Sequence, residues 1–290
     1  MKKTTVQIIR ALAITGAIAA CVPLMAQQPY PQQPYPSGYP APYSGTAPVF
    51  APQQLDGLVS QIALYPDPLL AQVLTAATFP DQIPQAAGWA NSHRYLNGDA
   101  LANAIYQDRL PWDPSVLALL PFPSVLDMMA RDQNWTRQLG GAVLSQRPDV
   151  MDAVQRMRQR AMDYGYLRNT PQERIVMGGP GAIEILPVDP GYYYVPVYNP
   201  GIVFGRRAGV GAVISFGPRV FIGASFAPWG WRDPRLDWRA HTVVIDRRPW
   251  DRTWVNRDRY VHTYAVPPRE RFEGPRVERH DRDMREHRDR

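Results

Sequence analysis

Between residues 53 and 168, apolar residues recur at helical spacing, and prolines divide the chain into short segments. The stretch LYPDPLLAQVLTAATFP shows this pattern. Pro66 restricts the residue before it to an extended conformation, which ends a helix predicted over residues 53–64. Asp67 is then expected to cap a second helix, and Pro68 takes its first turn, where a missing N–H costs nothing. The prolines are therefore predicted to be corners between short helices.

The same pattern continues to the end of this region. Residues 124–131 and 132–144 are predicted helices, and Gly140-Gly141 is expected to bend the second one. The clearest predicted helix covers residues 149–164, because apolar residues line one of its faces. Those residues are Val150, Val154, Met157, Ala161 and Tyr164. Arg158 lies late in this helix between two other arginines, where the helix dipole favours cations.

After residue 178 the pattern becomes that of β structure. The runs AIEILPV and GYYYVPVYNPGIVFG are rich in β-branched and aromatic residues, with proline and glycine between them. Two similar runs follow, AVISFGP and FIGASFAP, and Pro218-Arg219 is placed to turn a hairpin between them. The predicted fold class is α+β, with an all-helical N-terminal domain followed by a small β-rich region. No transmembrane helix is expected here, because the segment 209–228 holds an arginine and six glycines or prolines.

The N-terminus predicts export. MKKTTVQIIRALAITGAIAACVPLMAQQ has a basic start and an apolar run that is shorter than the about 20 residues of a membrane span. Cleavage after Ala26, which would leave Gln27 first, is favoured; the alternative is lipidation of Cys21 in the lipobox-like IAAC. Cys21 is the only cysteine, so the mature chain has no disulfide, thiol nucleophile or thiolate metal site.

Two further segments are predicted to stay outside the packed part of the chain. Residues 27–52 contain QQPYP twice and favour an extended polyproline II spacer, with a ligand for a proline-reading groove as the alternative. Residues 267–290 mix arginine with acidic residues and hold few apolar ones, so a disordered tail is predicted. The predicted organisation is signal peptide 1–26, linker 27–52, helical domain 53–178, β-rich region 179–266 and charged tail 267–290.

Basic charge is concentrated in the β-rich region. Residues 206–260 hold 11 Arg against 5 Asp, a net +6, whereas residues 53–205 hold 10 Arg against 14 Asp and Glu, a net −4. An acidic partner is therefore expected to meet residues 206–260. Aromatic rings and guanidinium groups suit such a surface, so the candidate binding residues are Trp229, Trp231, Trp238, Arg232, Arg235 and Arg239. The alternative is that the aromatic residues fill a small β core, which is favoured for Tyr193 and Val195.

Four stretches resemble a bacterial family catalogued as domain of unknown function 3300. They are ALYPDPLLAQVLTAATFP, PWDPSVLALLPFPSVLDMM, NWTRQLGGAVLSQRPDVMDAVQRMRQRA and YYYVPVYNPGIVFG, which together cover roughly residues 55–205, about half of the chain. The resemblance implies an exported, envelope-associated protein of Gram-negative-type bacteria, with a helical domain and a variable low-complexity C-terminus. It implies no enzyme activity and transfers no functional residues.

The sequence carries no catalytic or cofactor motif. It lacks H-E-x-x-H, G-x-S-x-G, a Walker loop and G-x-G-x-x-G, so no metal site and no cofactor are expected. Asp67, Asp113 and Asp233 each precede a proline, where helix capping or a turn explains them. The favoured interpretation is therefore a non-enzymatic binding or structural protein of the periplasm or the outer-membrane periphery. The alternative is an envelope hydrolase with an unrecognised pair of carboxylates.

The predicted export also limits which partners are expected. Outside the cytoplasm, the acidic partners within reach are lipid head groups, lipopolysaccharide and peptidoglycan, and another envelope protein is a further option. A nucleic acid would suit the same composition but is not expected in that compartment.

Export is directly testable. Mass spectrometry of protein recovered from the cell envelope should find a chain that begins at Gln27, or at a lipidated Cys21. Recovery of a chain that still begins at Met1 would contradict the prediction.

Overall fold

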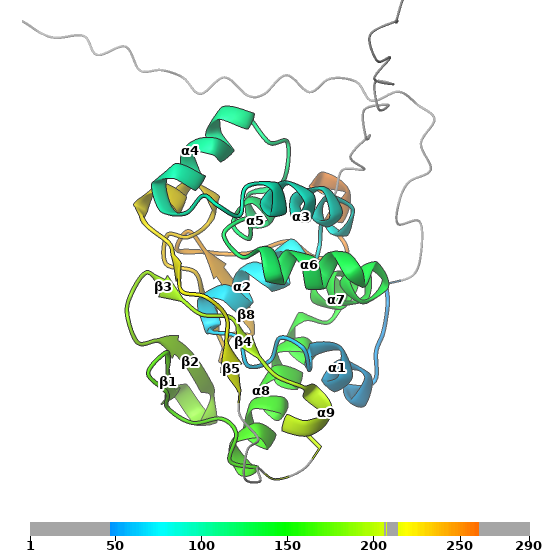
Figure 1. The fold of residues 1–290 in the computed structure, drawn as a ribbon. Helices are drawn as coiled ribbons and strands as arrows, with labels where there is room; N and C mark the ends of the chain where they lie inside the picture. The colour runs from blue at the N-terminus through cyan, green and yellow to red at the C-terminus, as the bar shows by residue number, and fades with distance from the viewer. Residues whose placement is uncertain (1–46, 206, 208–213, 261–290) are drawn as a thin grey trace, which may run out of the picture. The chain divides into compact units, whose positions relative to one another are not determined.

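The computed structural model describes residues 47–205, 207 and 214–260 (Figure 1). Helices come first and small antiparallel sheets follow, so the predicted α+β class is confirmed. The signal peptide, most of the linker and the charged tail lie outside the described residues, and those expectations stay predictions. None of the described helices is long and apolar enough to cross a membrane.

The first part of the described chain is helical. Its elements are α1 (Pro52–Val59), α2 (Asp67–Ala76), η1 (Pro80–Gln82), α3 (Ile83–Ser92), α4 (Gly98–Asp108), α5 (Pro114–Leu117), α6 (Pro123–Arg131), α7 (Gln133–Ser145) and α8 (Arg147–Asp163). Proline lies in the first turn of α1, α2, α3, α5, α6 and α8, which confirms the predicted role of prolines as corners.

Local capping chemistry explains several of the ends. Asp113 caps α5 as expected, since its Oδ1 accepts from the backbone N–H of Ser115 at 2.9 Å. Gly165 takes a left-handed φ of 82° just after the end of α8, which is a common way for a helix to end. The first helix is shorter than the predicted 53–64: it ends at Val59, where the Ser60 hydroxyl donates to the Gly57 carbonyl.

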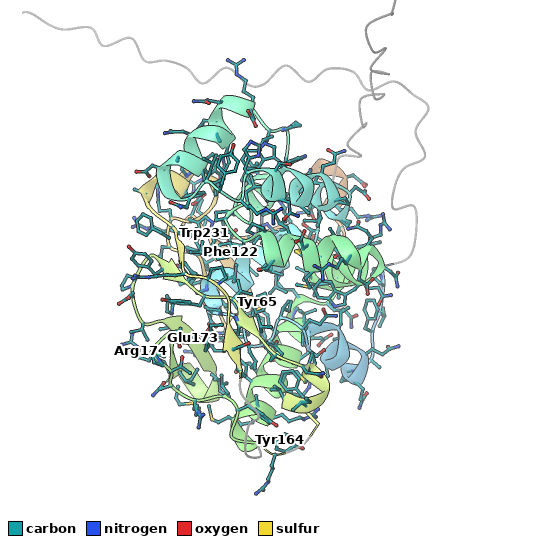
Figure 2. All side chains as sticks on the ribbon, viewed as in Figure 1. Tyr65, Phe122, Tyr164, Glu173, Arg174 and Trp231 are labelled. Atoms are coloured by element: carbon teal, nitrogen blue, oxygen red, sulfur yellow. The ribbon has the colours of Figure 1, made fainter. Side chains whose placement is uncertain are left out.

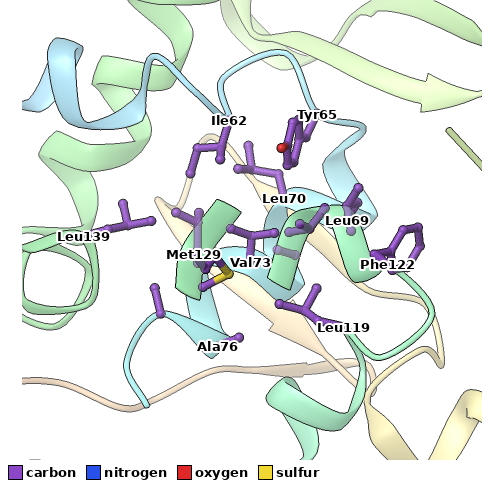
Figure 3. Packing of buried hydrophobic residues seen from close by; sticks show 14 of the residues in the cluster. Ile62, Tyr65, Leu69, Leu70, Val73, Ala76, Leu119, Phe122, Met129 and Leu139 are labelled. Carbon is purple, nitrogen blue, oxygen red and sulfur yellow. The ribbon is translucent and has the colours of Figure 1, made fainter. Parts of the chain in front are cut away.

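Helix α2 is the centre of the core. Every residue from Leu69 to Pro80 is buried, so this helix is enclosed on all sides rather than along one stripe. Helix α2 contacts α5 and α7, and Figure 3 shows Met129 of α6 beside Val73 of α2. The same helix also contacts strands of the second part of the chain.

The second part of the described chain forms short antiparallel strands. β1 (Glu173–Met177) pairs with β2 (Ile183–Pro187). β3 (Tyr192–Tyr193) pairs with β6 (Val220–Phe221), and β4 (Pro196–Val197) pairs with β5 (Ser215–Phe216). β7 (Arg235–Asp237), β8 (Thr242–Ile245) and β9 (Arg248–Pro249) form a sheet in that order. The remaining elements are η2 (Gly179–Gly181), α9 (Pro200–Val203), η3 (Ala224–Trp229) and η4 (Arg257–Arg259).

The predicted hairpin around Pro218-Arg219 is wrong. β5 and β6 pair with β4 and β3 instead of with each other, so the chain from residue 215 to 221 runs back along residues 192–197. The run FIGASFAP enters η3 after Phe221 rather than forming a second strand. Pro228 lies inside η3, and a proline cannot donate to a strand ladder.

The predicted border between the helical domain and the β-rich region, at residues 178/179, marks a change in residue composition and does not separate two packed units. It falls between β1 and β2, whose residues pair across it. Buried residues of the helical and strand regions form one hydrophobic cluster, and α2 contacts β2, β7 and β8. Independent folding of residues 53–178 therefore stays a prediction, and the structure shows that such a fragment would expose apolar surface of α2.

Gly140 does not bend α7, which continues through it to Ser145. A Cβ at this position would lie 2.1 Å from the carbonyl oxygen of Ala77. Glycine is therefore required at this position, because the backbone of α7 packs directly against the backbone at the end of α2 and leaves no room for a side chain.

Replacing Gly140 with Ala should lower the free energy of unfolding by about 1–3 kcal/mol, because a backbone group must move to admit the new methyl group. Gly88→Ala in α3 is the matched control, since no atom lies within 4 Å of the position that its Cβ would take. That control should be neutral or stabilising by up to about 1 kcal/mol. Urea unfolding of both variants is the measurement, and equal effects would contradict the packing argument.

Candidate functional site

The three tryptophans predicted as binding residues lie in the core. Trp229, Trp231 and Trp238 are 6%, 8% and 8% exposed. The Trp231 ring centroid lies 5.7 Å from that of Phe122 and 4.9 Å from that of Tyr193, and its Nε1 donates to the Ala118 carbonyl. Figure 2 shows Trp231 beside Phe122. These rings fill space between the helices and the strands, so they offer no flat aromatic surface to a ligand.

The structure thus shows the alternative arrangement, in which these aromatic residues fill the core instead of forming a binding surface. Tyr193 and Val195, for which the sequence favours the core alternative, are also buried. Trp229 packs against Phe226 and against the exposed Tyr106 of α4.

The predicted arginines have the opposite placement. Arg232, Arg235 and Arg239 are exposed. Arg235 and Arg239 alternate with the buried Leu236 and Trp238 along β7 and the residues after it, whereas Arg232 lies in the turn before β7. Arg235 pairs with the exposed Asp233 at 2.7 Å. Two more exposed arginines follow at the β8–β9 turn and on β9. We use the name arginine face for the five exposed arginines on β7, on β9 and in the turns beside them, which are Arg232, Arg235, Arg239, Arg247 and Arg248.

A buried polar cluster lies beneath this sheet, centred on Arg158 of α8. The side chain of Arg158 is fully buried, and it donates four hydrogen bonds. Three go to the carbonyl groups of Ala63, Tyr65 and Ile183, at 2.8, 3.0 and 2.7 Å. The fourth goes to Oδ1 of Asp67 at 2.7 Å.

Asp67 completes the cluster. It does not cap α2 through its side chain; instead it is buried and accepts three hydrogen bonds. Besides Arg158, the donors are the backbone N–H of Ile185 at 3.2 Å and Nε1 of Trp238 at 2.7 Å. The guanidinium carbon of Arg158 also lies 4.9 Å from the centre of the Trp238 ring. We call Asp67, Arg158 and Trp238 the Arg158 cluster.

One signal in the sequence pointed to this role. Arg158 follows Val154 by four residues and precedes Ala161 by three, so it falls on the apolar stripe of its helix. Its identity as the core cation was missed because the helix dipole gave a simpler explanation. The partner of Arg158 could not be found in this way, since Asp67 lies 91 residues away.

A second buried acid, Glu173, lies at the start of β1 (Figure 2). It is 4% exposed. Burial raises its pKa to about 8, and the positive charge of Arg158 opposes that shift in part. Glu173 lines a small cavity of about 80 Å³.

A wider groove of about 370 Å³ lies between α1, α8 and α9. Asp56 is the one carboxylate that lines it, and Asp56 pairs with Arg156 at 2.7 Å. Glu173 is the one carboxylate that lines the smaller cavity. Neither of these described spaces therefore holds the carboxylate pair that the hydrolase alternative requires. Within the described part of the chain, no three metal-ligating side chains lie together.

Comparison with known proteins gives the family. A family model described as a protein of unknown function (DUF3300) matches residues 51–263. The chain belongs to the DUF3300 family. This confirms the resemblance and extends it through the β-rich region. The candidate cleavage and lipidation residues Ala26, Gln27 and Cys21 lie outside both this match and the described residues.

A curated relative of this DUF3300 chain is the uncharacterized protein YacH of Escherichia coli (strain K12). It is 34% identical over 190 residues, which cover 55% of this chain and 30% of YacH. The chain thus matches less than a third of the length of this relative. No solved structure matches the chain.

Replacing Arg158 with Ala should lower the free energy of unfolding by about 3–5 kcal/mol, because Asp67 would remain buried without its cation. Arg156→Ala is the matched control: it lies on the same helix but forms an exposed pair with Asp56, which should contribute less than about 1 kcal/mol. Urea unfolding measures both. Similar losses in the two variants would show that the buried cluster does not hold the fold.

Glu173 should make the stability depend on pH. Its pKa of about 8 in the folded chain lies above the ordinary 4.5, so the folded state binds more protons between these values. The free energy of unfolding should therefore fall as pH rises from about 4.5 to 8, by up to about 5 kcal/mol. Glu173→Gln should remove this dependence on pH. The free energy of unfolding of the wild type should therefore fall relative to that of the variant between about pH 4.5 and pH 8. A constant difference between the two from pH 5 to 9 would contradict the assignment.

Proposed function

We propose that this DUF3300 protein is an exported, non-enzymatic protein of the cell envelope that binds an anionic component through the arginine face. The observation that carries the proposal is the exposure of five arginines within residues 232–248, a stretch of chain in which Trp238 is buried. Guanidinium groups form strong, paired hydrogen bonds with phosphate and carboxylate oxygens. The N-terminal basic and apolar pattern supports export.

Charge and availability favour this surface. Residues 232–248 hold five exposed arginines and three exposed aspartates, Asp233, Asp237 and Asp246, for a net +2. Arg232, Arg239 and Arg248 form no ion pair with the described residues, so their guanidinium groups can meet a partner. The binding is electrostatic and exposed, and it should weaken as the screening length falls from about 8 Å at 0.15 M salt to about 3 Å at 1 M.

The test compares two triple variants of the full chain with equal charge. Arg232, Arg239 and Arg248 are replaced with Gln in one, and Arg131, Arg160 and Arg174 in the other; all six residues are exposed. Each arginine near an anionic surface contributes about 1 kcal/mol, so the first variant should bind phosphatidylglycerol vesicles about 100-fold more weakly at low salt. The second should bind within about threefold of wild type.

Co-sedimentation with vesicles and with purified peptidoglycan reads out both variants. Loss of binding in the first variant alone supports the proposal, and the sedimenting material identifies the component. Equal loss in both variants would show that net charge and not the arginine face is responsible. Absence of wild-type binding to either material at low salt would also contradict the proposal.

A further inference from the structure

The small cavity beside Glu173 combines apolar walls with polar groups. Leu64, Leu167, Pro196, Ile214 and Phe216 supply the apolar walls. Its polar lining comes from Tyr166, Arg168, Thr170 and Glu173, which lie on β1 and the loop that follows α8. Its volume of about 80 Å³ admits two or three groups of the size of a water molecule, each of which takes about 30 Å³.

Two of these side chains have polar atoms that the protein does not satisfy. Oε1 of Glu173 and the hydroxyl oxygen of Tyr166 are shielded from solvent, and neither has a hydrogen-bond partner among the described residues. Buried polar groups are satisfied in the great majority of folded proteins. Glu173 and Tyr166, two residues that line one cavity, thus each carry an orphaned polar atom, which points to a ligand with complementary polar atoms.

The chemistry of the lining favours a ligand that accepts hydrogen bonds. Thr170 Oγ1 accepts from the backbone N–H groups of Gln172 and Glu173, so its hydroxyl hydrogen is still available to donate. Tyr166 can also donate, and Glu173 can donate in its protonated form. Arg168 is exposed and adds a positive charge on the same lining.

We propose that this cavity binds a carboxylate group, either of a small free acid or of the C-terminal end of a peptide chain. A carboxylate has two acceptor oxygens and three non-hydrogen atoms, which matches both the donors and the volume. An ammonium group would instead be repelled by the positive charges of Arg168 and Arg158. The charged or titratable groups that face Glu173 are Arg158, Arg168, Tyr166 and Tyr198.

The proposal does not depend on the arginine face. Protonated Glu173 donates to the ligand, whereas its ionised form repels it. With a pKa of about 8, affinity should be about tenfold weaker at pH 9 than at pH 7. In Glu173→Gln the side-chain amide can donate at every pH, so the carboxylate affinity of that variant should not change between pH 7 and pH 9.

The test measures thermal stabilisation of the full chain at constant ionic strength, with sodium chloride as the reference. Acetate and N-acetyl-alanyl-alanine represent the two carboxylate sources, and the C-terminal amide of that peptide and methylammonium are the negative probes. At pH 7 the carboxylates should raise the melting temperature, and the negative probes should not. Stabilisation by acetate but not by the peptide would identify a small acid, and the reverse would identify a chain end.

Tyr166→Phe should weaken carboxylate binding several-fold, since it removes one donor. Tyr164→Phe is the matched control, because Tyr164 does not line the cavity. This pair keeps the test decisive if Glu173→Gln fails to fold. Equal stabilisation by acetate and chloride at pH 7, stabilisation by methylammonium, or an unchanged response of Tyr166→Phe would overturn the proposal.

Discussion

The buried ion pair between Arg158 and Asp67 is the interaction on which the rest of this structure depends. It is 2.7 Å long, and both side chains are removed from solvent. A buried charge is tolerated only when hydrogen bonds satisfy its polar atoms. Here Arg158 also donates to three backbone carbonyl groups, and Asp67 also accepts from Trp238. Since these partners come from α2, α8, the turn before α2, β2 and the segment after β7, the pair joins the helical and strand regions into one core.

The same constraint explains which residues of the C-terminal region are buried and which are exposed. Trp238 must reach Asp67, and Gln72 of α2 donates to the Gly230 carbonyl at 2.7 Å, so the chain between them lies against the central helix. The tryptophans are thereby committed to packing, and alternation along the strand turns Arg235 and Arg239 outward. A basic surface over an aromatic core is the consequence, and it is this surface that the proposed binding function uses.

The sequence predicts the parts of this fold that local chemistry determines. The proline corners, the cap at Asp113 and the end of α8 at Gly165 follow from residues within one turn of each other. Asp67 could not be assigned in this way: its position before Pro68 suits a cap, and only the folded chain brings Arg158 beside it. Gly140 was misread for the same reason, because the carbonyl of Ala77 that excludes a side chain is 63 residues away. The cavity at Glu173 is likewise lined by four separate segments, residues 64, 165–173, 196 and 214–216, so no spacing in the sequence could indicate it.

Native-state hydrogen exchange tests most directly whether the helical and strand regions form one cooperative unit around the Arg158 cluster. Amides of α2, α8 and β8, for example those of Val73, Val154 and Val243, would be followed at increasing urea concentrations. If the account is correct, the slowest amides of all three elements exchange with the same free energy and the same dependence on urea, because they open together in global unfolding. Exchange of β8 amides at a much lower free energy, while α2 and α8 stay protected, would contradict it.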